Sequence, residues 1–182
     1  MIVCMHCYGS GDDPEVRTPR EYAGITEYLD AVAEYIIRQK PERLTLLICG
    51  GMKDAKGIIE ADSIAEAMRR RLEGRLHKNC IFFIKKVYEK STISIVRFAF
   101  EWLRSNCIRP QIVIICDKAR EGKTRWLAQR FSGGIPFEII AFKRRDNWKT
   151  TILRSNRIAQ MIELWLIKRN LERTRQKIEE NR

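Results

Sequence analysis

The sequence predicts a single three-layer α/β domain, with about five mainly parallel strands and helices on both faces of the sheet. Short apolar runs alternate with segments of helical spacing five times along the 182 residues. Two of these runs, residues 44–49 and 112–116, are almost wholly apolar, as expected for strands that are covered on both faces. Because 45% of the residues are hydrophobic, the chain can bury a core. The pattern is typical of a Rossmann-like fold.

The first half of the chain predicts two strand–helix units. Residues 2–7 form the first strand, and a loop rich in turn formers follows it. Thr18 has the chemistry of a helix N-cap and Pro19 suits a first helical position, so a helix begins there. Residues 44–49 form the second strand, which ends at two glycines. A second helix begins near Glu60, where apolar residues take up helical spacing.

The second half predicts three further strands and two connecting helices. The short apolar run 81–84 is the third strand, and Ser91 or Thr92 caps the helix after it. The fourth strand is the second of the apolar runs named above. Asp117 then caps a fourth helix, and residues 137–142 form the fifth strand.

The remainder of the chain is expected to form one helix. Residues 1–146 would make the α/β domain, and residues 147–182 a long basic helix packed on it. Asn147 opens this helix. After Leu171 the sequence is almost entirely polar, which predicts a frayed end.

Positive charge is concentrated near the C-terminus. The net charge is +12, and residues 143–182 hold twelve Lys/Arg against five Asp/Glu. An excess of this kind favours anionic partners, such as nucleic acid, a phosphorylated ligand or an acidic membrane surface. The alternative is a solvated basic helix that has no partner.

Cysteine usage and hydropathy predict a cytoplasmic protein without a membrane span. No stretch approaches the roughly 20 apolar residues that a spanning helix needs, and no signal peptide is visible. The six cysteines are spread along the chain, and four fall within or at the ends of apolar runs. We therefore expect reduced thiols that act as small hydrophobic residues.

Four loops follow the carboxyl ends of the predicted strands, where open α/β sheets bind ligands. Together they supply glycine turns, hydroxyl groups, cations and helix N-termini, a combination that favours a phosphate or carboxylate ligand. Glu60 and Asp117 are the candidate acid/base groups if the protein is an enzyme. The glycines would let a ligand approach the backbone, and the cations would hold its negative charge. The expected ligand-binding residues are Gly9, Ser10, Gly50, Gly51, Ser91, Thr92, Ser94, Lys118, Arg120 and Lys123.

None of these loops carries a strong motif. The chain has no P-loop sequence, no GxGxxG after the first strand and no GxSxG elbow. Ordinary turn and helix-cap chemistry is the alternative explanation for each residue taken singly.

No metal site and no histidine-based triad are expected. Cys4 and Cys7 form a CxxC, but residues three apart on a strand point to opposite faces, and no second ligand pair exists. Neither histidine has an evident partner in the sequence. Cys7, Cys49 and Cys116 each end a predicted strand, so neighbouring strands would bring three thiols to one edge, where a small residue suits converging loops.

The chain resembles the YdcF-like family, which includes the SanA and ElyC envelope proteins. Cys49-Gly50-Gly51 and Glu60-Ala61 are similar to the family's strand ending in Gly-Gly and its Ser-Glu-Ala helix start. The family's glutamate and Ser/Thr-rich helix start are matched in place by three residues: Glu89, Ser91 and Ser94. Lys123 keeps a cation where the family has arginine. The resemblance spans roughly residues 1–142.

The chain also departs from the family's pattern. Val96 and Arg97 stand near the positions of the family's Asn and Glu, and Arg120 replaces its histidine. The resemblance implies an α/β fold, a link to envelope biogenesis and S-adenosylmethionine as a candidate ligand. The departures leave a binding role better supported than any particular reaction.

Three functions are left open. The first is a small protein that binds a nucleotide, an S-adenosylmethionine-like molecule or a phosphorylated envelope precursor at the carboxyl edge of the sheet, with hydrolysis or group transfer as the reaction if it is an enzyme. The second is a non-enzymatic nucleic-acid-binding or protein-interaction module that uses the basic C-terminal region together with Arg69-Arg70-Arg71. The third is a degenerate family member that serves as a structural partner.

Overall fold

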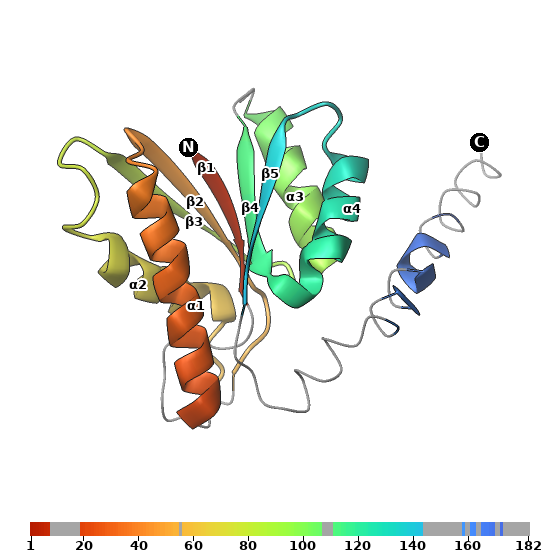
Figure 1. The fold of residues 1–182 in the computed structure, drawn as a ribbon, viewed down its shortest axis with the longest axis horizontal. Helices are drawn as coiled ribbons and strands as arrows, with labels where there is room; N and C mark the ends of the chain where they lie inside the picture. The colour runs from red at the N-terminus through yellow and green to blue at the C-terminus, as the bar shows by residue number, and fades with distance from the viewer. Residues whose placement is uncertain are drawn as a thin grey trace. The chain divides into compact units, whose positions relative to one another are not determined.

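A computed structural model describes residues 1–7, 19–54, 56–106 and 111–143, together with 158, 161, 162, 165–169 and 172. It contains a five-stranded, all-parallel sheet with helices on both faces, which confirms the predicted three-layer α/β fold (Figure 1). The elements in chain order are β1 (Ile2–His6), α1 (Pro19–Arg38), β2 (Arg43–Cys49), α2 (Glu60–Leu72), β3 (Ile81–Val87), α3 (Thr92–Ser105), β4 (Ile112–Asp117), the 3₁₀ turn η1 (Lys118–Arg120), α4 (Glu121–Phe131) and β5 (Phe137–Phe142).

The first strand lies at the centre of the sheet. The strand order is β3-β2-β1-β4-β5. Ile2 is paired with Thr45 of β2 on one side and with Ile112 of β4 on the other. Every residue of β1 and β4 is buried, which explains why their sequences are apolar without alternation.

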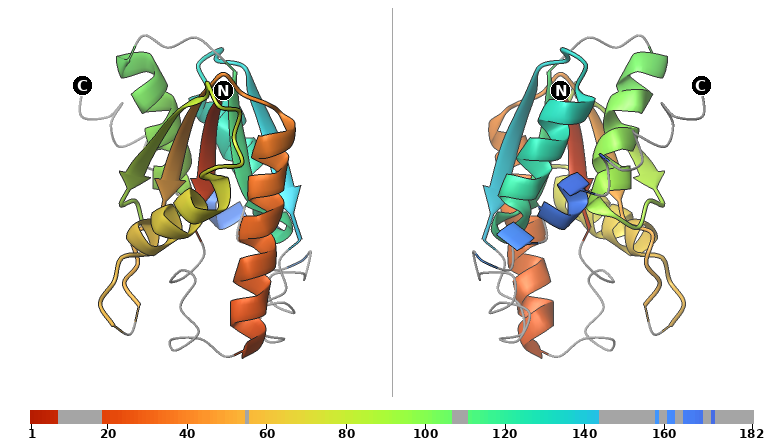
Figure 2. Two further views of the ribbon diagram at one scale, coloured as in Figure 1. Left: turned by 90° about the vertical axis from the view of Figure 1, so that its left-hand side faces the viewer. Right: turned by 90° about the vertical axis from the view of Figure 1, so that its right-hand side faces the viewer.

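Helices α1 and α2 cover one face of the sheet, and α3 and α4 cover the other (Figure 2). Val3 and Met5 of β1 belong to the core cluster that contains residues of α1 and α2. Cys4 alternates with them and therefore faces α3 and α4. On that side the rings of Phe100 in α3 and Phe137 in β5 meet edge to face, with centroids 6.0 Å apart.

The outer strand β3 is less covered than the others. Ile81 and Phe83 are exposed on it, with 62% and 56% of their surface accessible. The strand is longer than the predicted run 81–84 because it continues through Lys85 and Lys86 to Val87. Lysines are tolerated there because an edge strand is only partly buried.

The chain divides into two compact units, Met1–Asp146 and Asn147–Arg182. In the second unit the described residues are helical. Packing of this helix on the α/β domain stays a prediction, and the expected helix starts at Thr18 and Asn147 lie outside the described residues. Across the part of the chain that the structure describes, we find no helix with the length and apolar character needed to cross a bilayer.

Candidate functional site

The strand order places a topological switch point between β1 and β4. The chain runs from β1 to β2 and β3 on one side, and α3 then carries it across to β4 on the other. In open α/β sheets, ligands bind in the crevice outside the carboxyl ends of the strands at such a point. The loop after β4 is described. The loop after β1, which contains the expected residues Gly9 and Ser10, lies outside the described residues.

Gly50 and Gly51 are explained by close contacts within the protein. A Cβ atom at Gly50 would lie 2.7 Å from Cys7 Cβ and 2.9 Å from Glu60 Cβ. A Cβ atom at Gly51 would lie 2.2 Å from the carbonyl oxygen of Tyr88. Neither glycine has a positive φ, so space rather than backbone conformation requires glycine here. Their expected role in letting a ligand approach stays a prediction.

The first N–H groups of α2 donate hydrogen bonds to the protein's own backbone carbonyl groups. The N–H of Glu60 donates to Met52 O at 2.9 Å, and the N–H of Ala61 donates to Gly50 O at 3.1 Å. The next two N–H groups both donate to Ile59 O. An anion at this helix start would therefore have to displace an existing hydrogen bond. Glu60 itself is 7% exposed, and its side chain lies against Gly50.

The hydroxyl groups at the start of α3 form a capping box. The N–H of Ser94 donates to Ser91 Oγ at 3.1 Å, and the N–H of Ser91 donates to Ser94 Oγ at 3.2 Å. The two hydroxyl oxygens lie 2.9 Å apart. Thr92 is buried. Helix capping accounts for the two serines, and a ligand contact from these three residues stays a prediction.

The loop after β4 holds the expected acidic and basic residues in two groups. Asp117 is 3% exposed and caps η1, because its Oδ1 accepts the N–H of Arg120 at 3.1 Å. The Nε of Arg120 lies 3.8 Å from the other carboxylate oxygen. Lys118 turns away from this pair to contact Glu121, with Nζ and Oε2 2.5 Å apart. Asp117 was expected to cap α4, but the 3₁₀ turn intervenes and the helix begins at Glu121.

His6, which the sequence analysis set aside, lies at this switch point. It ends β1, is paired with Cys49 of β2 and is fully buried. The pKa of its imidazole is lowered from 6.5 to about 3, mainly by burial and in smaller part by the positive charges of Arg120 and Lys123. The ring is therefore neutral at physiological pH. The positive charges of Arg120 and Lys123 therefore act on the end of β1.

The three thiols near this edge are buried. Because β2, β1 and β4 are neighbours, Cys49, Cys7 and Cys116 do lie along the same end of the sheet. Burial raises the pKa of Cys116 to about 12, although a hydrogen bond from Thr124 acts in the opposite direction. The pKa of Cys49 is raised by burial, by the neighbouring thiols and by Glu89. A thiolate nucleophile is not favoured at these positions.

Within the described residues, no group of three or more His, Cys, Asp or Glu side chains could hold a metal ion. Cys4 and Cys7 lie on opposite faces of the sheet, as their spacing on a strand predicts. Cys7 belongs to the core on the side of α1 and α2. Cys4 has its sulfur 3.6 Å from Cys49 Sγ and is absent from that core.

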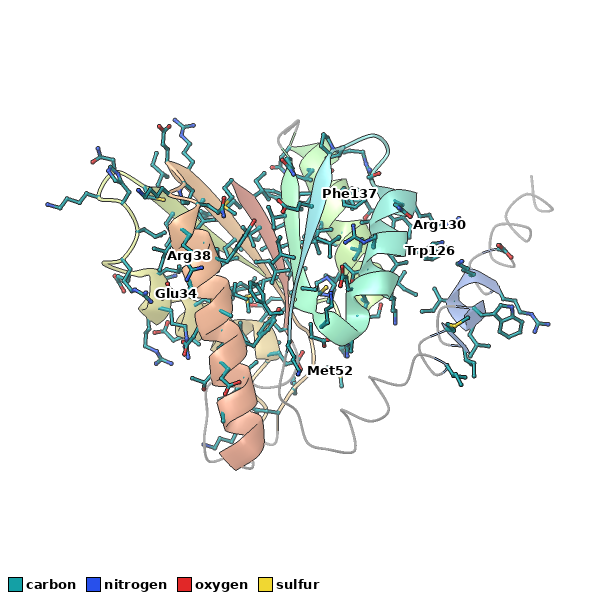
Figure 3. All side chains as sticks on the ribbon, in the orientation of Figure 1. Glu34, Arg38, Met52, Trp126, Arg130 and Phe137 are labelled. Atoms are coloured by element: carbon teal, nitrogen blue, oxygen red, sulfur yellow. The ribbon has the colours of Figure 1, made fainter. Side chains whose placement is uncertain are left out.

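Figure 3 labels one residue near the carboxyl ends of the strands and two on α4. Met52 lies at the end of the sheet where the strands finish, and 53% of its surface is exposed. Trp126 and Arg130 lie on the outer side of α4, with the guanidinium carbon 5.8 Å from the ring centroid. They are therefore a surface pair rather than part of the site.

No family model, curated protein or solved structure matches this chain.

Proposed function

We propose that the protein binds an anionic small molecule at the carboxyl edge of the sheet, between the ends of β1 and β4. The observation that carries the proposal is that the positive charges of Arg120 and Lys123 act on the buried His6, which ends β1 at the switch point. Both cations are only half-buried, so a ligand can reach them from solvent. A phosphate or carboxylate group would form charge-assisted hydrogen bonds with them.

Arg120 and Lys123 act on His6, whereas the neighbouring cations lie beside a different carboxylate. Lys118 and Arg125 both contact the carboxylate of Glu121, which compensates their charge. Arg120 also lies beside Asp117, with its Nε 3.8 Å from the carboxylate oxygen Oδ2, so this edge offers a carboxylate next to a cation. Lys123 contributes a second positive charge that acts on His6.

The ligand classes proposed are a nucleotide, an S-adenosylmethionine-like molecule and a phosphorylated envelope precursor, the last two from the resemblance to the YdcF-like family. Membership of that family is itself part of the proposal. If the protein is an enzyme, hydrolysis or group transfer with Glu60 or Asp117 as the acid/base group fits best. A cytoplasmic location is proposed with it, supported by free thiols at all five described cysteines.

Calorimetric titration with inorganic phosphate, AMP, ATP and S-adenosylmethionine tests the proposal. Lys123→Gln and Arg120→Gln should each weaken the best ligand by about tenfold or more, since a charge-assisted hydrogen bond contributes about 1.5–3 kcal/mol. Arg125→Gln is the matched control, because it removes the same charge from the outer side of α4 and should leave affinity unchanged. Absence of binding by all four ligands, or equal loss in the control, would refute the site.

The alternative of a nucleic-acid-binding module rests on the charge of the C-terminal region. Residues 147–182 hold nine Lys/Arg and four Asp/Glu. The described residues of that region also expose several large apolar side chains, which a phosphate backbone does not cover. Nucleic acid would therefore match the charge of this region but not its exposed apolar side chains.

A further inference from the structure

The helical residues of the C-terminal unit carry an exposed apolar face. Its members recur at spacings of three and four, which places them on one side of a helix. Each has between 46% and 70% of its surface exposed: Ile158, Met161, Ile162, Trp165 and Leu166. Scattered apolar residues on a surface need no explanation, but five on one helical face mark an interaction site.

Basic residues adjoin this apolar face. Arg169 stacks over the Trp165 ring, with its guanidinium carbon 5.2 Å from the ring centroid. Lys168 precedes it in the same helical stretch. Residues 147–182 carry an excess of five positive charges over their whole length. A basic helix with a large apolar face and a tryptophan has the features of helices that lie in a membrane interface.

We propose that residues 147–182 bind the surface of a membrane that contains anionic lipid. The face defined by Ile158, Met161, Ile162, Trp165 and Leu166 would enter the boundary between headgroups and acyl chains. The Lys and Arg side chains would lie among the negatively charged headgroups. The protein would thereby be held at the membrane surface while the α/β domain binds its own ligand.

Charge favours a lipid surface over a second copy of the chain. Two copies joined through this face would bring two segments of the same positive charge together, whereas an anionic bilayer has the opposite sign. Nucleic acid has the right charge, but it would leave the five apolar side chains in water. An anionic membrane is the partner that matches both features.

Co-sedimentation of the full chain with vesicles tests this proposal. Phosphatidylcholine vesicles are compared with vesicles of phosphatidylcholine and phosphatidylglycerol in equal parts. We expect affinity at least about tenfold higher for the anionic vesicles, with a loss of affinity at high salt. Trp165→Asp should weaken binding by about tenfold or more. The substitution removes a large apolar side chain from the interface and introduces a negative charge, which the anionic lipid repels.

Phe83→Asp is the matched control. Phe83 is an aromatic residue of nearly equal exposure, 56% against 54% for Trp165, and it lies on β3 outside the proposed surface. The Phe83→Asp variant should bind vesicles with the same affinity as the wild type. Since Trp165 is exposed, thermal unfolding followed by circular dichroism should be nearly the same for Trp165→Asp and the wild type.

Three results would overturn the proposal. The first is no binding to anionic vesicles, or equal binding to both vesicle types. The second is an equal loss in Phe83→Asp and Trp165→Asp. The third is evidence for another partner. Light scattering would show a wild-type dimer that Trp165→Asp converts to a monomer, or the protein would bind polyuridylate tightly and Trp165→Asp would leave that affinity unchanged. Those outcomes would assign the segment to self-association or to nucleic acid instead.

Discussion

Lowering the pH from 7 to about 5 should destabilise the folded protein by about 2 kcal/mol through His6 alone. The imidazole has a pKa of about 3 in the folded protein, against 6.5 in an unfolded chain. Between these two values the unfolded state binds one proton more than the folded state does. Protonation therefore pulls the equilibrium toward unfolding as the pH falls. The loss would approach about 5 kcal/mol near pH 3, where the folded state also becomes protonated.

Other groups do not obscure this effect in the chosen window. Hydrogen bonds from Arg75 to Glu34, and from Lys118 to Glu121, lower the pKa of each carboxyl group below 4.5. The stability that these ion pairs contribute is present above the unfolded pKa and is lost only as the pH falls below it. Measurements between pH 7 and about 5 are therefore dominated by His6.

Urea unfolding at the two pH values measures the effect, with tryptophan fluorescence as the signal. The variant His6→Gln cannot gain a proton and should lose about 2 kcal/mol less than the wild type between the two pH values. His77→Gln is the control, because His77 is exposed, and it should keep the wild-type pH dependence. If His6→Gln folds poorly, the His6 ring signals of the wild type can be followed by NMR. Titration of those signals near pH 6.5 would contradict burial beside Arg120 and Lys123.

Two stability predictions concern local geometry. Gly50→Ala should lower the free energy of unfolding by about 1–3 kcal/mol, because the new methyl group would overlap Cys7 and Glu60. Gly122→Ala in α4 should raise it by about 0.5–1 kcal/mol, because a Cβ atom there meets no atom within 4 Å. Equal urea midpoints for the two alanine variants would contradict the close approach at Gly50. Ser91→Ala should cost about 1 kcal/mol by removing the α3 cap, and an unchanged midpoint would show that the cap is dispensable.

The sequence predicted the fold well because the central strands are covered on both faces. The runs 44–49 and 112–116 became β2 and β4 with nearly the expected bounds. The prediction of the third strand was too short, since Lys85 and Lys86 interrupt the apolar run on an edge that remains partly exposed. The apolar runs show where the strands lie in the sequence, but they do not show which strands are neighbours in the sheet. The strand order therefore could not be predicted from them.

The sequence indicated the region of the site better than its chemistry. A parallel sheet gathers its loops at one end, so Glu60 and Asp117 were predicted as candidates from position alone, and their role stays a prediction. The contacts that require Gly50 and Gly51 come from Cys7 and Tyr88, which are distant in sequence. His6 was missed for the same reason: the two cations whose charges act on it, Arg120 and Lys123, lie far along the chain in η1 and α4.

The central position of β1 also determines when the site can form during synthesis. Ile2 pairs with Thr45 early, but its partner Ile112 in β4 is made much later. At translation rates of roughly 5–20 residues per second, on the order of ten seconds separate the emergence of the two strands. The β3-β2-β1 half with α1 and α2 can assemble first, and one edge of β1 stays open meanwhile. Arg120 and Lys123, whose charges act on His6, are made only in the last stage, so a truncated or stalled chain would have a core without the cations of the candidate site.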